Sequence, residues 1–182
     1  MLDPAIEFVL RGGLALLLLS TALHKTRDFA AFRAAVIGYA LAPERFAAAI
    51  AALLATAEAA IGVALLAPAS LGLRALALVA TALLLALYAA AIAVNLARGR
   101  RDIDCGCAGP AARQPLSEWL LARNAILVAA ALVCLGGAAV RPLVWIDVLT
   151  VSGGVAMSVA AWLAAHRLLA NAPALARLRE GA

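Results

Sequence analysis

Five segments of this chain are each long and apolar enough to cross a membrane, which limits its possible folds more than any other feature. A hydrocarbon core of about 30 Å needs roughly 20 residues of helix. The segments lie at about residues 5–23, 46–67, 75–97, 116–140 and 143–165. Backbone polar groups inside a bilayer must bond to one another, as they do in helices. The sequence therefore predicts one membrane domain over residues 1–182: an all-α polytopic bundle with four core transmembrane helices and a fifth, weaker one.

The composition excludes an ordinary soluble domain. Hydrophobic residues make up 66% of the 182 residues and charged residues 14%, against roughly 45–50% and about 25% in soluble domains. The net charge of +5 comes from arginines in the loops, which suits contact with the anionic headgroups of a lipid bilayer. No basic run with interleaved aromatics occurs, so nucleic acid is not an expected partner.

A shorter amphipathic segment at residues 27–40 separates the first two crossings. Its large apolar residues, Phe29, Phe32, Val36 and Tyr39, recur every three or four positions, opposite charged residues. This spacing predicts a helix with one apolar face, and we expect it to lie in the membrane interface. An ordinary loop helix packed on the bundle is the alternative.

The distribution of basic residues predicts how the bundle is oriented. Counting crossings places Arg11, Arg74 and Arg141 on one side of the membrane and the other twelve Lys and Arg residues on the opposite side. The loop at residues 98–115 belongs to the basic side. Because cytoplasmic loops carry an excess of Lys and Arg, this side is predicted to face the cytoplasm.

Two of the three cysteines lie one residue apart in that loop, as Cys105-Gly106-Cys107. Their Cα atoms are about 5–7 Å apart for any backbone conformation, which is within the range of a disulfide. Gly106 can adopt backbone angles closed to other residues, so a tight ring can close. Strained, exposed disulfides are labile. The loop therefore predicts a redox-active Cys105–Cys107 disulfide and no further cofactor. The alternative is two incidental thiols.

Several charged residues are candidates to support this chemistry. A reactive cysteine must be a thiolate, which nearby cations favour. Lys25, Arg101 and Arg123 all fall on the basic side, where they would supply positive charge. Asp104 would oppose that effect but is placed to relay a proton.

Ionisable groups inside the crossings are also candidates, because they are costly in a membrane. Glu7 and Arg11 are one helical turn apart and are expected to pair. Glu58 lies near the middle of the second crossing. It either pairs with Arg11 or Arg123, or carries a proton linked to the thiol chemistry. Cys134, deep in the fourth crossing, is expected to be a small buried hydrophobe.

Two other functions remain open from the residues alone. His24 and His166 fall on the same side as the two thiols, so a tetrahedral Cys₂His₂ site can be drawn, and two thiolates also suit Cu(I). This soft-metal or metallochaperone-docking function ranks below redox exchange, and no metal is predicted. The third hypothesis is a non-catalytic assembly subunit that holds a partner at the membrane.

A set of short motifs resembles one known family. The matching residues are His24-Lys25, Gly38-Tyr39 with Pro43, Glu58, Asn95-Leu96, Arg98-Gly99-Arg100, Asp104-Cys105-Gly106-Cys107, Pro115-Leu116 and Arg123-Asn124. Over about residues 8–135 the chain is similar to MauE, a family of methylamine utilisation membrane proteins within the DoxX-like group. The family pattern has an aromatic residue after the second cysteine, where this chain has Ala108.

The resemblance implies a thiol–disulfide oxidoreductase role, with Cys105 and Cys107 as the redox pair. It implies a multi-pass protein of the bacterial inner membrane that works beside a thioredoxin-like partner, MauD. Together they would form or reshuffle disulfides in the small subunit of methylamine dehydrogenase. Lys25, Glu58 and Arg123 match family positions to which no role is assigned.

The compartment expected for the client conflicts with the membrane orientation that the charge count predicts. Client disulfides form outside the cytoplasm, whereas the arginine bias places the thiols inside. An inverted chain, a loop that dips into the bundle, or reductant passed outward would each resolve the conflict.

Overall fold

The computed structural model describes residues 2–67, 70–103, 115–139 and 141–180, with side chains up to Ala165 and at Arg167. These residues are almost wholly helical, and the only extended pairing among them is an isolated bridge between Leu2 and Ala138. In chain order the helices are α1 (Pro4–Arg27), α2 (Phe29–Tyr39), the 3₁₀ turn η1 (Glu44–Phe46), α3 (Ala47–Leu66), α4 (Leu71–Ala97), α5 (Glu118–Leu135) and α6 (Trp145–Glu180). The predicted all-α class is confirmed.

Five of the helical segments are long and apolar enough to span a membrane. They run over Pro4–Arg27, Glu44–Leu66, Leu71–Ala97, Glu118–Leu135 and Trp145–Ala165. The chain is therefore a multi-pass helical membrane protein, as the five apolar segments predicted. The fifth helix continues past the predicted boundary at residue 165 to Glu180.

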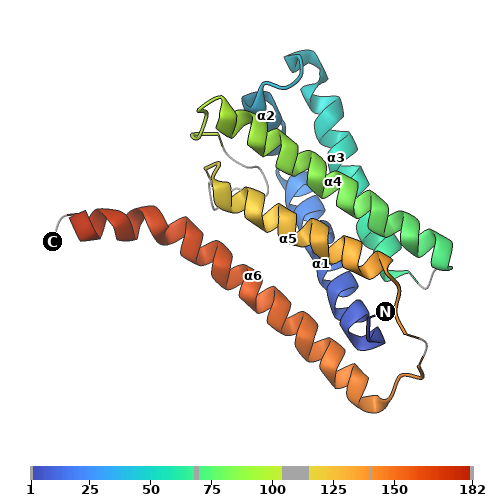
Figure 1. Cartoon of the computed structure of the whole chain (residues 1–182). Coiled ribbons are helices and arrows are strands. Elements are labelled where there is room, and N and C mark those ends of the chain that lie inside the picture. Colours follow the sequence, from blue (N-terminus) through green and yellow to red (C-terminus); the bar gives the residue numbers. More distant parts are fainter. Residues whose placement is uncertain (1, 68–69, 104–114, 140, 181–182) are drawn as a thin grey trace.

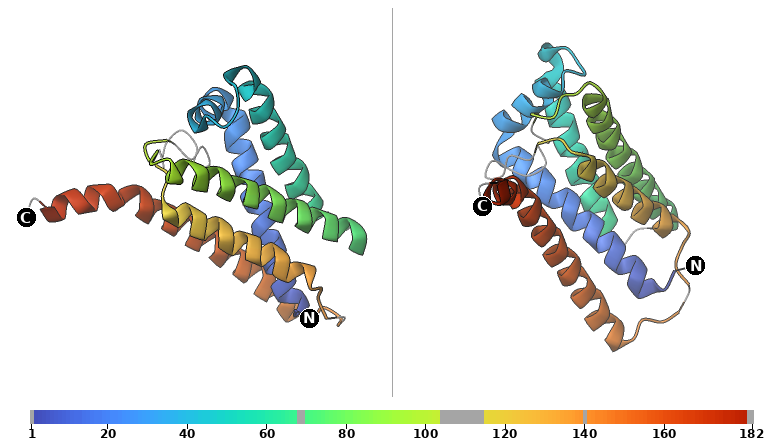
Figure 2. Two further views of the ribbon diagram at one scale, coloured as in Figure 1. Left: turned by 45° about the horizontal axis from the view of Figure 1, so that its top comes forward. Right: turned by 60° about the vertical axis from the view of Figure 1, so that its left-hand side comes forward.

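The helices form two closely packed pairs with one outlying helix (Figures 1 and 2). The most extensive contacts join α4 to α5 and α1 to α3, and α1 also contacts α5 and α6. The C-terminal part of α6 extends beyond the other helices in Figure 1. Helix α1 thus lies at the centre of the bundle.

Local sequence signals explain where α1 begins and α5 ends. The Asp3 side chain accepts a hydrogen bond from the Ala5 amide, and Pro4 occupies the first turn of α1, as expected at a helix N-terminus. Helix α5 ends at Leu135, five residues before the predicted boundary at 140. Gly137 has a φ of +77°, a conformation that glycine adopts readily after a helix.

Helix α2 packs on the bundle, chiefly against α3. Of its apolar face, Phe32 is buried, Val36 and Tyr39 are half-buried, and Phe29 is at the limit of exposure. The predicted helix and its apolar face are therefore confirmed. Its position in the membrane interface stays a prediction.

Glycines allow α1 to approach two neighbouring helices closely. A Cβ atom on Gly62 would lie 2.8 Å from Leu19 Cγ, at the contact between α1 and α3. A Cβ atom on Gly154 would lie 2.7 Å from Val9 Cγ2, where α6 meets α1. Close approach through small residues is how membrane helices gain packing contacts in the absence of a hydrophobic driving force.

The main apolar core joins α1, α3, α4 and α5. It includes Leu14, Leu18, Leu65, Leu78 and Cys134. Cys134 is a free, buried cysteine, which confirms the prediction that it packs as a small hydrophobe.

Candidate functional site

Three polar side chains from different helices form a closed triangle of hydrogen bonds inside the bundle. Lys25 of α1 lies 2.5 Å from Glu58 of α3, measured from Nζ to Oε1, and each side chain is only 1% exposed. The hydroxyl of Tyr88, on α4, donates to the same Glu58 oxygen at 2.7 Å and accepts from Lys25 Nζ at 3.1 Å. We call this group the Lys25–Glu58–Tyr88 triad. A charge pair buried in a membrane span costs free energy, so such pairs are rare and commonly mark functional sites.

Aromatic rings enclose the ammonium group of the triad. Lys25 Nζ lies 4.6 Å from the ring centroid of Phe32 and 4.6 Å from that of Tyr88. A cation within about 6 Å of a ring face is attracted by the negative face of the π-system. Helix α2 therefore covers the triad with its buried aromatic residue, Phe32.

The predicted partners of Glu58 were wrong. Arg11 pairs with Glu7 at 3.3 Å, as expected, and also donates to the backbone oxygen of Leu65. Arg123 stacks on Trp162 of α6, 5.0 Å from the ring centroid. Lys25 is the ion-pair partner because the C-terminal end of α1 packs beside the middle of α3, a helix register that counting charges does not reveal.

The segment that carries Cys105 and Cys107 begins and returns next to the C-terminal end of α2. Arg100 donates to the carbonyl oxygens of Gly38 (2.9 Å) and Tyr39 (3.3 Å), and to Asn95 Oδ1 at 3.1 Å. The Leu116 amide donates to the Arg101 carbonyl at 3.1 Å. These bonds fix both described ends of the loop to the bundle, and we call this region the loop base.

The loop base also rests on a small apolar cluster. Ile92, Leu116 and Leu120 are buried there, with Tyr39, Leu96 and Ile103 packed against them. Ile92 follows Tyr88 by one helical turn of α4, which is about 6 Å along the helix axis. The loop base and the triad are thus neighbours along α4, at the same end of the bundle.

The predicted site residues fall into four groups. Lys25 and Glu58 are brought together in the triad. Arg101 forms an exposed pair with Glu118, which raises the pKa of the guanidinium through a side-chain hydrogen bond. Arg123 lies apart from both, and its Nε is buried with no hydrogen-bond partner among the residues that the structure describes. Asp104, Cys105, Gly106 and Cys107 lie outside the described residues.

Sequence reasoning missed Tyr88 and the covering role of Phe32. Tyr88 is the only aromatic residue in the aliphatic run of α4, and a buried tyrosine hydroxyl usually has a hydrogen-bond partner. That signal, combined with Glu58 and Lys25 in neighbouring spans, would have pointed to the triad.

A second polar cluster lies at the opposite end of the bundle. Glu7 is buried and pairs with Arg11 and with Arg74 of α4, at 3.3 Å in each case. At the same end of the bundle, Arg141 forms ion pairs with Asp3 at 2.9 Å and with Asp147 at 2.7 Å. The hydrogen bond from Arg141, helped by the Ala5 amide, lowers the pKa of Asp3 below its ordinary value. These contacts tie the ends of α1, α4 and α6 together.

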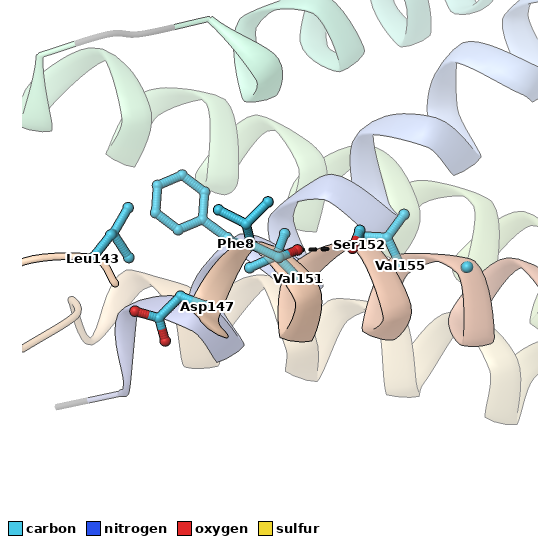
Figure 3. A pocket seen from close by; sticks show the side chains of 8 residues that line it. Phe8, Leu143, Asp147, Val151, Ser152 and Val155 are labelled. Carbon is cyan, nitrogen blue, oxygen red and sulfur yellow. Dashed lines mark hydrogen bonds between the residues drawn. The ribbon is translucent and has the colours of Figure 1, made fainter. Parts of the chain in front are cut away.

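An apolar cavity of about 590 Å³ separates α6 from the start of α1. Phe8 of α1 lines it together with Val148, Val151 and Val155 of α6 (Figure 3). It lies at the end of the bundle opposite the loop base and holds no convergent set of polar groups. Among the described residues, no group of three or more His, Cys, Asp and Glu side chains is placed to hold a metal ion, and His24 is exposed.

Fold and site together define a small polytopic membrane protein with a buried ion-pair triad near the described ends of the segment that carries the cysteines. The family model described as "Methylamine utilisation protein MauE" matches residues 4–137. The chain belongs to the MauE family. Helix α6 lies outside the matched region.

Curated relatives agree with this assignment. The chain is 39% identical to methylamine utilization protein MauE of Paracoccus denitrificans over 132 residues, which cover 72% of this chain and 69% of the relative. It is 41% identical to the Paracoccus versutus protein over 140 residues, covering 77% and 72%, and 37% identical to the Methylorubrum extorquens protein over 129 residues, covering 71% and 68%. No solved structure shows significant similarity to the chain.

Proposed function

We propose that this protein is an inner-membrane thiol–disulfide redox protein of methylamine utilisation. Cys105 and Cys107 exchange a disulfide with a thioredoxin-like, MauD-like partner. The exchange forms or reshuffles disulfides in the small subunit of methylamine dehydrogenase or a similar extracytoplasmic client. The names of its relatives, methylamine utilization protein MauE, support methylamine utilisation as the context.

One observation carries the proposal: the loop that bears the two cysteines starts and ends beside a buried acid–base triad. Thiol–disulfide exchange involves proton transfer. The attacking thiol must lose its proton to become the nucleophilic thiolate, and the sulfur that it displaces leaves as a thiolate that can take a proton up. Lys25, Glu58 and Tyr88 supply a carboxylate, an ammonium and a hydroxyl in hydrogen-bond contact. A purely structural membrane subunit has no need of such a group one helical turn from the base of a cysteine-bearing loop.

The remaining supporting residues act through charge and position. Arg101 and Arg123 are cations on the same end of the bundle as the loop base, and cations favour the thiolate. Asp104 and Gly106 flank the first cysteine in the sequence. Gly106 allows the ring to close, and Asp104 supplies a further carboxylate for proton transfer.

Single cysteine variants test the proposal. With Cys107→Ser, Cys105 forms a mixed disulfide with the partner that cannot be resolved and is trapped, and client maturation stops. With Cys105→Ser, maturation stops as well. Cys134→Ser is the matched control, because Cys134 is buried in the main core and takes no part. Normal client maturation in both Cys105→Ser and Cys107→Ser would rule the proposal out.

A further inference from the structure

Among the arginines that the structure describes, Arg123 is the one half-buried side chain whose guanidinium has no oxygen acceptor. The other four half-buried arginines each donate to a carboxylate or a carbonyl oxygen: Arg11, Arg74, Arg100 and Arg141. The Nε atom of Arg123 is buried without a hydrogen-bond partner, and no described residue forms an ion pair with the side chain. Arginine stays charged in proteins, and a charge in a membrane span is costly without a partner. The described part of the chain therefore lacks one anion at this position.

The ring of Trp162 covers one face of the guanidinium. Arg123 Cζ lies 5.0 Å from the ring centroid. Helix α6 packs mainly on α1, and α5 mainly on α4, so this contact joins two helices that touch little elsewhere. Stacking occupies the flat face of the guanidinium and leaves the edge that carries the N–H donors for an acceptor in the same plane. A phosphate group matches that edge with two parallel hydrogen bonds.

The tryptophans place Arg123 near the depth of the lipid headgroups. Tryptophan is enriched at both membrane–water interfaces. In α6 the 17 residue steps from Trp145 to Trp162 span about 26 Å of helix, close to the thickness of a hydrocarbon core, about 30 Å. Trp119 lies one helical turn before Arg123 in α5, so a second tryptophan marks the same interface. Arg123 therefore lies beside the headgroups on the side of the loop base.

The membrane leaflet on this side provides a suitable anion. Most Lys and Arg residues of the chain were assigned to this side, which the charge count predicts to be cytoplasmic. Cytoplasmic leaflets carry anionic lipids, and basic sites between transmembrane helices on that side bind their headgroups. We propose that Arg123, held by Trp162, binds the phosphate of an anionic phospholipid from this leaflet. This inference goes beyond the proposed redox function and does not depend on it.

The test uses the full chain in vesicles of phosphatidylglycerol and phosphatidylcholine, with Trp119→Phe and Trp145→Phe so that Trp162 is the sole tryptophan. Brominated acyl chains, placed on one lipid and then on the other, quench the fluorescence of Trp162. The ratio of the two quenching levels gives the relative affinity of the two lipids beside that ring. Arg123→Gln removes the charge. Arg45→Gln is the matched control, because Arg45 is an exposed arginine assigned to the same side and also lies over a ring, 4.8 Å from the Phe46 centroid.

The parent should prefer the anionic phosphatidylglycerol beside Trp162 by about fivefold, the factor that one basic residue contributes at an anionic membrane surface. Arg123→Gln should abolish this preference, and Arg45→Gln should keep it. Arg123→Lys keeps the charge without the planar fork, so it should retain a smaller preference, which separates phosphate binding from a loss of fold. Equal quenching by the two lipids in the parent, or the same loss in both glutamine variants, overturns the proposal.

Two further arms distinguish a bound lipid from other sources of negative charge. In 1 M NaCl, where the screening length falls to about 3 Å, the preference should persist, because the half-buried guanidinium touches the phosphate directly. Its disappearance would indicate a diffuse attraction to the basic surface and contradict a lipid site at Arg123. Inorganic phosphate, added at constant ionic strength, should leave the preference unchanged. A preference that inorganic phosphate removes would assign Arg123 to a soluble anion and overturn the lipid assignment.

Discussion

At the scale of single residues, the ion pair between Lys25 and Glu58 dominates the interior of the bundle. Both side chains are 1% exposed and 2.5 Å apart, so removing one strands the other charge away from water. Lys25→Met or Glu58→Gln is therefore expected to lower the free energy of unfolding by about 3–5 kcal/mol. The double variant should lose less than the two single variants together, because no charge remains unpaired.

Denaturant unfolding in detergent measures this interaction through a double-mutant cycle. Arg33→Met is the control, since Arg33 and Glu44 form an exposed pair with atoms 3.9 Å apart. Such pairs contribute about 0–1 kcal/mol. Strictly additive losses for Lys25 and Glu58 would show that the buried pair is not energetically coupled.

The ion pair of Asp3 makes the stability of the protein depend on pH in a predictable direction. The hydrogen bond from Arg141 holds the pKa of Asp3 below its ordinary value of 3.8. Because the folded-state pKa is the lower one, the ionised carboxylate stabilises the fold above pH 3.8, and this stabilisation is lost as the pH falls through the folded-state pKa. Asp3→Asn should therefore be less stable than the parent at pH 6, and the gap should close below pH 3.8.

Thermal unfolding of the parent and of Asp3→Asn across pH tests whether the stability gap between them closes on acidification. A second variant, Arg141→Gln, should remove most of the pH dependence that Asp3 contributes. A stability gap that widens on acidification would contradict the assigned ion pair.

At the scale of elements, α6 is attached to the bundle through a close contact with α1. A Cβ atom on Gly154 would meet both Cγ atoms of Val9, at 2.7 and 3.1 Å, whereas one on Gly153 would meet nothing within 4 Å. Val9 is β-branched and stiff at χ1, so the helices must move apart. Gly154→Ala is expected to destabilise the contact by about 1–3 kcal/mol.

Gly153→Ala is the matched control, one position away on the same helix. It should be neutral or slightly stabilising, because alanine favours helix over glycine. Cross-linking between α1 and α6, measured alongside unfolding, reports the separation directly. Equal effects of the two substitutions would mean that α6 does not pack at Gly154.

The helices could be predicted from the sequence more fully than the side-chain contacts between them. Apolar length alone revealed the five spans, because a membrane demands about 20 residues of helix. The end of α5 was placed too late, since the pattern stayed apolar past Gly136 and the left-handed Gly137 was not weighed. The partner of Glu58 could not be predicted, because it depends on how α1, α3 and α4 are shifted along one another. Tyr88 was not singled out from the sequence for the same reason.

At the scale of the whole molecule, the two ends of α4 should lie on opposite sides of the membrane. Gly72 and Arg98 are both exposed, and the 26 residue steps from one to the other span about 39 Å of helix. Twelve of the 15 Lys and Arg residues were assigned to the side of Arg98, which predicts that this side is cytoplasmic.

Single reporters in a cysteine-free background test this orientation. Gly72→Cys should react with an impermeant thiol reagent in spheroplasts, and Arg98→Cys should react only after the membrane is opened. The reverse pattern would place the cysteine loop outside, directly beside an extracytoplasmic client.

The central claim is that the disulfide between Cys105 and Cys107 forms and is reduced repeatedly while the protein matures its client. Its most direct measurement is mass spectrometry of the alkylated protein, taken from cells that are assembling their client enzyme. The account predicts both oxidation states, in a ratio that shifts when the thioredoxin-like partner is removed. A pair fixed in one oxidation state, with and without the partner, would contradict it.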